Sequence, residues 1–288
     1  MLSYRHAFHA GNFADVLKHS VLTLALEYMT RKEKGFSYID SHSGAGMYKL
    51  ADDYAQKTGE YKDGIAKIIT QHDLPDALLP YTELIASLNQ IQINKDSKDS
   101  KQLALYPGSP GIAKAILRRQ DTANLFELHP SDTQLLSDYC QRWRKCHIKQ
   151  SDGYQGVLSL LPPPSRRGVV LIDPPYEIKT DYQIAVQTLI KSYKKFATGT
   201  YILWYPVVKR PLIDQMIALF KQSQVKNLLQ AEFCLHQDSD EYGMTGTGLF
   251  IINPPWQLAS QLDEILPYLQ KKLGNKHSSY TLEQLIQE

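Results

Sequence analysis

Short apolar runs alternate with amphipathic segments along most of the chain. Apolar residues recur at helical spacing from Phe13 to Met29, and Asn12 precedes them as a candidate N-cap. Strands are predicted where apolar runs end at turn residues, at 35–40, 122–129, 146–153, 168–172, 201–208, 230–237 and 246–256. Further helices are predicted at 64–69, 81–88, 131–145, 181–195 and 211–222, and from Ser109, whose hydroxyl precedes Pro110 as a capping group.

The alternation of strands and helices predicts an α/β fold with a mostly parallel sheet. No helix is predicted between the last two strands, so we expect them to pair antiparallel. The segment 47–104 interrupts the alternation and contains helix-like stretches with prolines between them. We therefore expect one α/β domain, formed by 1–46 and 105–288, that carries a small helical insertion at 47–104.

Composition narrows the class of protein only slightly. Apolar residues make up 43% and charged residues 22% of the chain, which is ordinary for a globular protein, and the net charge is only +2. Between 140 and 210, however, twelve Lys and Arg face four Asp and Glu. This local excess favours a polyanionic partner such as nucleic acid, although charge alone fits a solvated basic face equally well.

Cysteines, histidines and the N-terminus exclude several other classes. The three cysteines have irregular spacing, and the nine histidines form no ligand set of recognisable spacing, so we expect neither disulfides nor a metal. No apolar signal segment or membrane span is visible, which predicts a cytoplasmic protein that does not contact membranes. No feature indicates an obligate protein partner, and we expect a monomer.

Polar residues stand at the carboxyl ends of four predicted strands. They are Asp40, followed by the glycine-rich turn 41–46 that contains Gly44, and then Glu127, Asp152 and Asp173. Ligands of open parallel sheets bind at this edge, and an acid after the second strand suits ribose hydroxyls. Glu127 follows Gly46 by eighty-one residues, a gap that the expected insertion explains.

The segment 173–176 has the sequence Asp-Pro-Pro-Tyr and fits a planar amine. Asp173 offers one acceptor for an N–H group, and the carbonyl of Pro174 offers a second whose direction the proline ring fixes. Tyr176 is expected to stack on a flat ring bearing that amine. The predicted chemistry is methylation of an exocyclic amine, in which Asp173 takes the proton that the product amine releases.

These motifs resemble the RlmJ family of methyltransferases. The resemblance extends to about residue 270 and includes the opening MLSYRHAFHAGNFADVLKH, HSGAG, YPGSP, ELHPSD, SRRG, IDPPYE, LWYPVV and INPPW. It implies a Rossmann-like class I fold with a seven-stranded sheet, a last antiparallel strand and the helical insertion. It also implies that S-adenosylmethionine is the cofactor and 23S ribosomal RNA the partner, methylated at the N6 amine of adenine 2030, with unassembled RNA as the expected substrate.

The resemblance assigns roles residue by residue. It implies a cofactor site formed by His19, His42, Gly44, Ser109, Glu127, Asp152, Gly153 and Asp173. Asp173 is also the implied catalytic residue, and Tyr4 is implied to meet the RNA. Tyr4 and His6 precede a helix and suit a flap over a base, although the residues alone fit a frayed terminus equally well. Lys18 is a candidate contact to phosphate, although an exposed helix lysine is the default interpretation.

Three other functions share parts of this pattern. A DNA adenine methyltransferase has the same tetrapeptide, but 47–104 looks too short for a domain that reads sequence. A non-catalytic RNA-binding protein is expected to have lost one of the polar residues at the strand ends, and all of them are present. A methyltransferase of glutamine amides does not need so many basic residues around its site. A second amine-methylase-like stretch, Asn253–Trp256, follows the strand expected to run antiparallel, so we interpret it as a structural turn.

Overall fold

The computed structural model describes residues 6–91, 103–239 and 243–288. One eight-stranded sheet organises the chain, with the strand order β10-β8-β9-β7-β6-β1-β4-β5. The strands are β1 (Ser37–Asp40), β4 (Thr122–Phe126), β5 (Cys146–Lys149), β6 (Gly168–Ile172), β7 (Thr200–Val207), β8 (Leu228–Cys234), β9 (Gly246–Ile252) and β10 (Ser279–Ile286).

Most of this sheet is parallel, as the sequence predicts. Strands β5, β4, β1, β6 and β7 pair parallel with their neighbours, while β9 pairs antiparallel with both β7 and β8. The expected antiparallel pairing of the last two predicted strands is therefore confirmed. The sheet has one strand more than the seven expected, because β10 adds antiparallel to β8.

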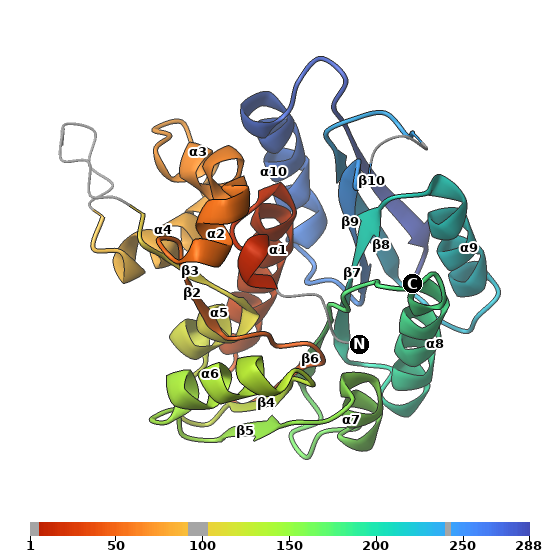
Figure 1. Cartoon of the computed structure of the whole chain (residues 1–288). Coiled ribbons are helices and arrows are strands. Elements are labelled where there is room, and N and C mark those ends of the chain that lie inside the picture. Colours follow the sequence, from red (N-terminus) through yellow and green to blue (C-terminus); the bar gives the residue numbers. More distant parts are fainter. Residues whose placement is uncertain (1–5, 92–102, 240–242) are drawn as a thin grey trace.

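Helices cover both faces of the sheet (Figure 1). Side chains alternate along the strands, so that Tyr38 contributes to the core on one face and Ile39 to the core on the other. One core includes α1 (Phe13–Thr30), α5 (Ser109–Ile116), α6 (Pro130–Cys140) and α10 (Leu258–Leu273). The other includes α7 (Gly153–Ser159), α8 (Thr180–Lys195) and α9 (Arg210–Lys221).

The segment 47–104 contains the expected helices. It starts with β2 (Met47–Lys49), which pairs antiparallel with β3 (Leu105–Pro107) just beyond its end. Between them lie α2 (Asp53–Thr58), α3 (Ile65–Ile69), α4 (Leu79–Leu88) and the short 3-10 helices η2 (Glu60–Asp63) and η3 (Asp76–Leu78). Ile65 and Ile85 of this segment share a core with α1. The division of the chain into two domains stays a prediction.

Helix α1 begins as predicted, since the side chain of Asn12 accepts a hydrogen bond from the backbone of Asp15. It packs against the sheet and against α4, so it is surrounded on several sides. Its polar residues Asp15, Lys18 and His19 are consequently buried along with its apolar ones. These three side chains therefore need polar partners inside the protein, and Lys18 finds one at the end of β6.

Candidate active site

A pocket of about 400 Å³ opens where the carboxyl ends of β5, β4, β1 and β6 meet. This volume is typical of a small-ligand site. Tyr4 lies outside the described residues, and Tyr176 is not among the described residues that line the pocket. The other residues proposed from the sequence all line it: His6, Lys18, His19, His42, Gly44, Ser109, Glu127, Asp152, Gly153, Asp173 and Pro174.

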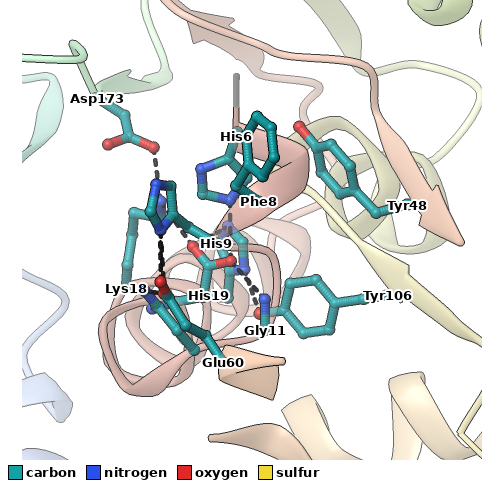
Figure 2. A network of polar contacts seen from close by, with 12 residues as sticks. His6, Phe8, His9, Gly11, Lys18, His19, Tyr48, Glu60, Tyr106 and Asp173 are labelled. Atoms are coloured by element: carbon teal, nitrogen blue, oxygen red, sulfur yellow. Dashed lines mark hydrogen bonds and ion pairs between the residues drawn. The ribbon is translucent and has the colours of Figure 1, made fainter. Parts of the chain in front are cut away.

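Lys18 joins α1 to the end of β6. Its Nζ lies 2.6 Å from Oδ2 of Asp173 and 2.9 Å from Oδ1 of Asp15 (Figure 2). Only 2% of this residue is exposed, so the default interpretation of an exposed helix lysine is wrong, while its contact to RNA phosphate stays a prediction. Burial opposes its charge, but the two carboxylates outweigh burial and raise the pKa of Lys18 above its ordinary value.

Asp173 keeps one carboxylate oxygen for a ligand. Its Oδ2 is bound by Lys18, while no hydrogen bond or ion pair from the described residues reaches its Oδ1. The carbonyl of Pro174 likewise accepts no hydrogen bond within the described parts of the chain. Both acceptors belong to residues that line the pocket, so the end of β6 can bind two N–H groups.

Asp15 connects this corner to the residues before α1. Its Oδ2 accepts a hydrogen bond from the backbone of Gly11 at 2.8 Å and lies 2.9 Å from Nε2 of His6. Burial opposes the charge of Asp15, but His6 and Lys18 hold its pKa well below the usual value. The sequence analysis missed Asp15, although its position three residues before Lys18 places both on one helix face.

A second set of contacts ties the N-terminal residues to the segment 47–104. The carboxylate oxygens of Glu60 lie 2.9 and 3.0 Å from Nδ1 of His9, and Asn12 donates a hydrogen bond of 2.9 Å to Oε2 (Figure 2). The hydrogen bond with Glu60 raises the pKa of His9. Glu60 therefore anchors the stretch that carries His6 to the pocket.

Asp40 and Ser109 lie beneath the pocket. Oδ2 of the fully buried Asp40 accepts hydrogen bonds from the hydroxyls of Ser109 at 2.6 Å and Tyr38 at 2.7 Å. Burial raises the pKa of Asp40 to about 6. Gly108, not Ser109, occupies the N-cap position of α5, so the prediction that Ser109 caps this helix is wrong. Its hydroxyl instead ties α5 to the end of β1.

Glu127 stands directly after β4 and faces the glycine-rich turn. Its Oε2 accepts a hydrogen bond from the backbone of Gly44 at 2.8 Å, and its Oε1 accepts one from the backbone of His129 at 2.7 Å. Burial raises the pKa of Glu127. Because a carboxylate oxygen has two lone pairs, each oxygen can accept one further hydrogen bond from a ligand.

Asp152 and Gly153 begin α7. Oδ1 of Asp152 caps this helix by accepting hydrogen bonds from the backbones of Tyr154 and Gln155, while its Oδ2 receives none within the described residues. A Cβ at Gly153 would lie 1.7 Å from the carbonyl oxygen of Ser41. Glycine is therefore required here for α7 to pack against the turn after β1.

The two histidines of the proposed cofactor site are neutral at pH 7. Burial lowers the pKa of His19 to about 3 and that of His42 to about 4. Nδ1 of His19 lies 2.7 Å from the hydroxyl of Tyr106, and Nδ1 of His42 lies 2.7 Å from Oγ of Ser41. Tyr106 is a further residue that the sequence analysis did not identify.

Tyr176 does not present the open ring that the sequence analysis expected. Its backbone is left-handed, with φ of 50°, and its hydroxyl donates a hydrogen bond of 2.6 Å to the carbonyl of Trp204. Its ring centroid lies 4.5 Å from that of Tyr182. The turn after the two prolines thus directs the ring toward β7 and α8, away from the pocket lining.

The described residues form no metal site, no disulfide and no membrane-spanning helix. No group of three or more His, Cys, Asp or Glu side chains there is arranged to hold a metal ion. Cys140, Cys146 and Cys234 are all free thiols. Among the described helices, none has both the length and the apolar character that crossing a bilayer requires.

Residues 33–286 match the family model described as "Ribosomal RNA large subunit methyltransferase D, RlmJ". The ribosomal RNA large subunit methyltransferase J of Escherichia coli is 49% identical over 282 residues, which cover 97% of this chain and 98% of that protein. The protein of the same name from Haemophilus influenzae is 47% identical over 289 residues and is covered completely, as is this chain.

Two solved structures are similar to this chain. A Legionella pneumophila protein is 37% identical and superposes with a TM-score of 0.86, covering 96% of this chain and 98% of that chain. A probable spermidine synthase from Corynebacterium glutamicum is 10% identical with a TM-score of 0.52, over 94% of this chain and 75% of that chain. The second likeness concerns the fold alone.

Proposed function

Because the chain belongs to the ribosomal RNA large subunit methyltransferase J family, we propose that it methylates the exocyclic N6 amine of an adenine in 23S ribosomal RNA. It has the Rossmann-like α/β fold of class I methyltransferases. The observation that carries the proposal is the arrangement of Asp173, whose Oδ2 is bound by a buried lysine while its Oδ1 is left for a ligand in a pocket of suitable size.

The cofactor is S-adenosylmethionine, which supplies a methyl group activated by a sulfonium charge. The residues that line the pocket fit this molecule. Each oxygen of Glu127 retains an acceptor site for one ribose hydroxyl, and Oδ2 of Asp152 is free to accept the amine of the adenine. His19 and His42 are neutral at pH 7, so neither repels a positively charged ligand.

Asp173 and Pro174 are proposed to hold the target amine. Two acceptors that bind both N–H groups favour a pyramidal nitrogen, whose lone pair is then no longer delocalised into the ring. When the nitrogen lone pair attacked the methyl carbon, the bond from that carbon to sulfur would break and its electrons would stay on sulfur, which would leave as a neutral thioether. The nitrogen would gain the positive charge, and Asp173 is placed to take the proton that it would then release. Lys18 and Asp15 keep the Asp173 carboxylate in one orientation, which reduces the entropy lost at this step.

The position of these groups in a pocket has a consequence for the substrate. An amine that is paired inside a duplex cannot reach the end of β6, so the target adenine must be unpaired or extruded from its helix. Extrusion costs a few kcal/mol, and this cost is smallest in RNA that is not yet assembled with proteins. We propose unassembled 23S RNA as the natural substrate and the cytoplasm as the place of reaction.

We propose that the protein acts as a monomer. All the residues assigned to the cofactor and to the amine come from one chain, and together they line one pocket. A second subunit is therefore not needed to complete the site.

The substrate class is tested by label transfer from methyl-labelled S-adenosylmethionine. Purified protein is offered protein-free 23S RNA that lacks the modification, adenine-containing duplex DNA, and a glutamine-containing peptide. The proposal expects label in the RNA alone. Label in DNA alone identifies a DNA adenine methyltransferase, label in the peptide identifies an amide methyltransferase, and cofactor binding without any transfer contradicts the assignment to free RNA.

A further inference from the structure

A second cavity lies at the amino-terminal ends of the parallel strands, opposite the candidate active site. Its volume is about 470 Å³, and it lies between the end of α1, the turn before β6, the start of β7 and the turn after β9. Because β9 runs antiparallel to β7, its carboxyl end lies beside the start of β7. The stretch Asn253–Trp256 therefore belongs to this edge, which agrees with its interpretation as a structural turn and separates it from Asp173.

The lining of this cavity is positively charged. It contains no Asp or Glu, and none of its cations forms an ion pair within the described parts of the chain. Cations near the end of α1 are expected, since they interact favourably with the helix dipole. That effect does not account for the cations of the turn before β6. The four cations are Arg31, Lys32, Arg166 and Arg167.

Three of these cations are free to bind a ligand. Arg167 is committed to the protein, because its guanidinium donates to the carbonyls of Met29 and Lys34. Arg31 donates only one hydrogen bond, from Nη1 to Gln257 at 2.6 Å. Lys32 and Arg166 are exposed, and their side chains form no hydrogen bond or ion pair within the described residues. The cavity thus presents Lys32 and Arg166 without a neutralising partner in the described residues, and Arg31, which lies over the ring of Tyr28 and whose charge also acts on the carboxylate of Glu27.

Trp256 supplies a flat apolar surface beside these cations. It is 74% exposed, more than any other large hydrophobic side chain in the described residues. The turn before it is rigid, since Nδ2 of Asn253 donates hydrogen bonds of 2.8 Å to the carbonyls of Ala197 and Gly199, and two prolines follow. A rigidly displayed ring loses little conformational entropy when a ligand stacks on it.

We propose that this cavity binds an unpaired segment of the substrate RNA, with one base stacked on Trp256 and adjacent phosphates on Arg31, Lys32 and Arg166. Cations that follow the backbone and an aromatic ring that stacks on bases are the two features that single-stranded nucleic acid requires. The inference rests on the proposed function, because it assigns the site to the same RNA whose adenine is methylated.

The separation of the two sites determines which RNA can use both. The five residues of β6 lie between the two edges and span about 17 Å. An RNA that reaches both edges must pass around a molecule whose radius of gyration is roughly 19 Å. A short stem–loop that places its adenine in the active site does not reach the second cavity, whereas a long fragment of 23S RNA does.

The first test measures binding of oligouridylate of about ten nucleotides, which lacks the target base and matches the length of single-strand sites. Trp256→Ala is expected to weaken binding about tenfold, and Trp256→Phe to retain it, because phenylalanine still stacks. Arg166→Gln is expected to lower the slope of log Kd against log salt concentration by about 0.7. Lys221→Gln, an exposed cation at the end of α9, is the control and leaves binding unchanged.

The second test compares methylation of a short stem–loop with that of a long 23S fragment. Trp256→Ala is expected to raise KM for the long fragment about tenfold and to leave the stem–loop reaction unchanged. If Trp256→Ala and Arg166→Gln bind oligouridylate and the long fragment with the affinity of the wild-type protein, the inference is overturned. A protein partner is then the remaining occupant of the cavity. If wild-type protein methylates neither RNA, while oligouridylate binding still depends on Trp256, the proposed function fails and the RNA-binding cavity stands.

Discussion

Lys18 lies on an amphipathic helix, at a position where the sequence pattern alone favours a solvated side chain or a contact to phosphate. In the structure it is buried between Asp15 of its own helix and Asp173 of the sheet edge. A buried charge is stable only beside charges of opposite sign. Removing any one of these three side chains therefore leaves a buried charge without compensation. The same three residues therefore matter for folding and for the proposed chemistry.

Replacing Lys18 by methionine tests this view. The change leaves the carboxylates of Asp15 and Asp173 without their shared cation, so we expect the free energy of unfolding to fall by about 3–5 kcal/mol. We also expect the rate of methyl transfer to fall about 100-fold, because Asp173 loses its fixed orientation. Urea denaturation and label transfer measure the two effects.

Lys67→Met is the matched control. Lys67 also pairs with an aspartate close by in the chain, Asp63, at 2.8 Å, but both side chains are largely exposed, at 47% and 81%. Exposed pairs contribute between nothing and about 1 kcal/mol. Equal effects of the two substitutions would show that the pairing of Lys18 has no special role.

His19 makes stability depend on pH. Burial lowers its pKa to about 3 from the ordinary 6.5. Between these values the unfolded chain binds a proton that the folded chain does not, so the stabilisation is present above pH 6.5 and is lost as the pH falls toward 3. Lowering the pH from 6.5 to 4.5 is expected to cost about 2 kcal/mol through this one residue.

Urea denaturation at both pH values checks this expectation. The fall in the free energy of unfolding between pH 6.5 and 4.5 is expected to be smaller by about 2 kcal/mol in His19→Gln than in the wild type. His277→Gln, at an exposed position, serves as the control. A fall in His19→Gln as large as that of the wild type would mean that His19 is not held neutral by burial.

At the scale of elements, the pocket depends on how closely α7 approaches β1. There is no space for a side chain at Gly153, because a Cβ there would lie 1.7 Å from the carbonyl oxygen of Ser41. Ser41 cannot retreat easily, because its own N–H is bound to the carbonyl of Leu171 at 3.0 Å. An added methyl group must therefore displace α7, and with it Asp152.

Gly153→Ala is expected to lower the free energy of unfolding by about 1–3 kcal/mol, as overpacking does. It is also expected to weaken S-adenosylmethionine binding by roughly 100-fold, because Asp152 moves with the helix. Gly243→Ala is the control, since a Cβ at Gly243 meets nothing within 4 Å. Calorimetric titration measures the affinity, and an unchanged value for Gly153→Ala would exclude close packing of α7 as a requirement.

The elements that carry the pocket were predictable from the sequence because each has a local signal. Buried strands such as 168–172 are continuous apolar runs, and polar residues such as Asp173 follow them directly. Parallel pairing then brings these ends together without further information. Helix α10 was not predicted, although its buried Leu258, Leu262 and Leu269 recur at helical spacing in the sequence.

Other features depend on tertiary contacts that no local pattern contains. The orientation of the Tyr176 ring is one such feature, because a left-handed backbone turns it toward Trp204. Its stacking on a target ring stays a prediction. The last strand, β10, is only half-buried at best, and its alternation of Tyr280, Leu282 and Ile286 is interrupted by Gln284 and by Leu285 on the other face. The burial of Lys18 follows from the packing of other elements around α1 and was equally hidden.

At the scale of the whole molecule, the sheet separates two surfaces with different chemistry. The carboxyl ends of its parallel strands form the pocket with Asp173, and the opposite edge presents cations beside Trp256. The strands between the two surfaces are covered by two apolar cores, one on each face of the sheet. We propose that the first surface methylates adenine through Asp173.

The most direct test of that claim compares wild-type protein with Asp173→Asn. Both are incubated with methyl-labelled S-adenosylmethionine and protein-free 23S RNA that lacks the modification, and the labelled nucleosides are identified. We expect N6-methyladenosine from the wild type and a rate lower by about 10³-fold from the variant at saturating cofactor. Methylation by Asp173→Asn at the wild-type rate, or label in a different nucleoside, would contradict it.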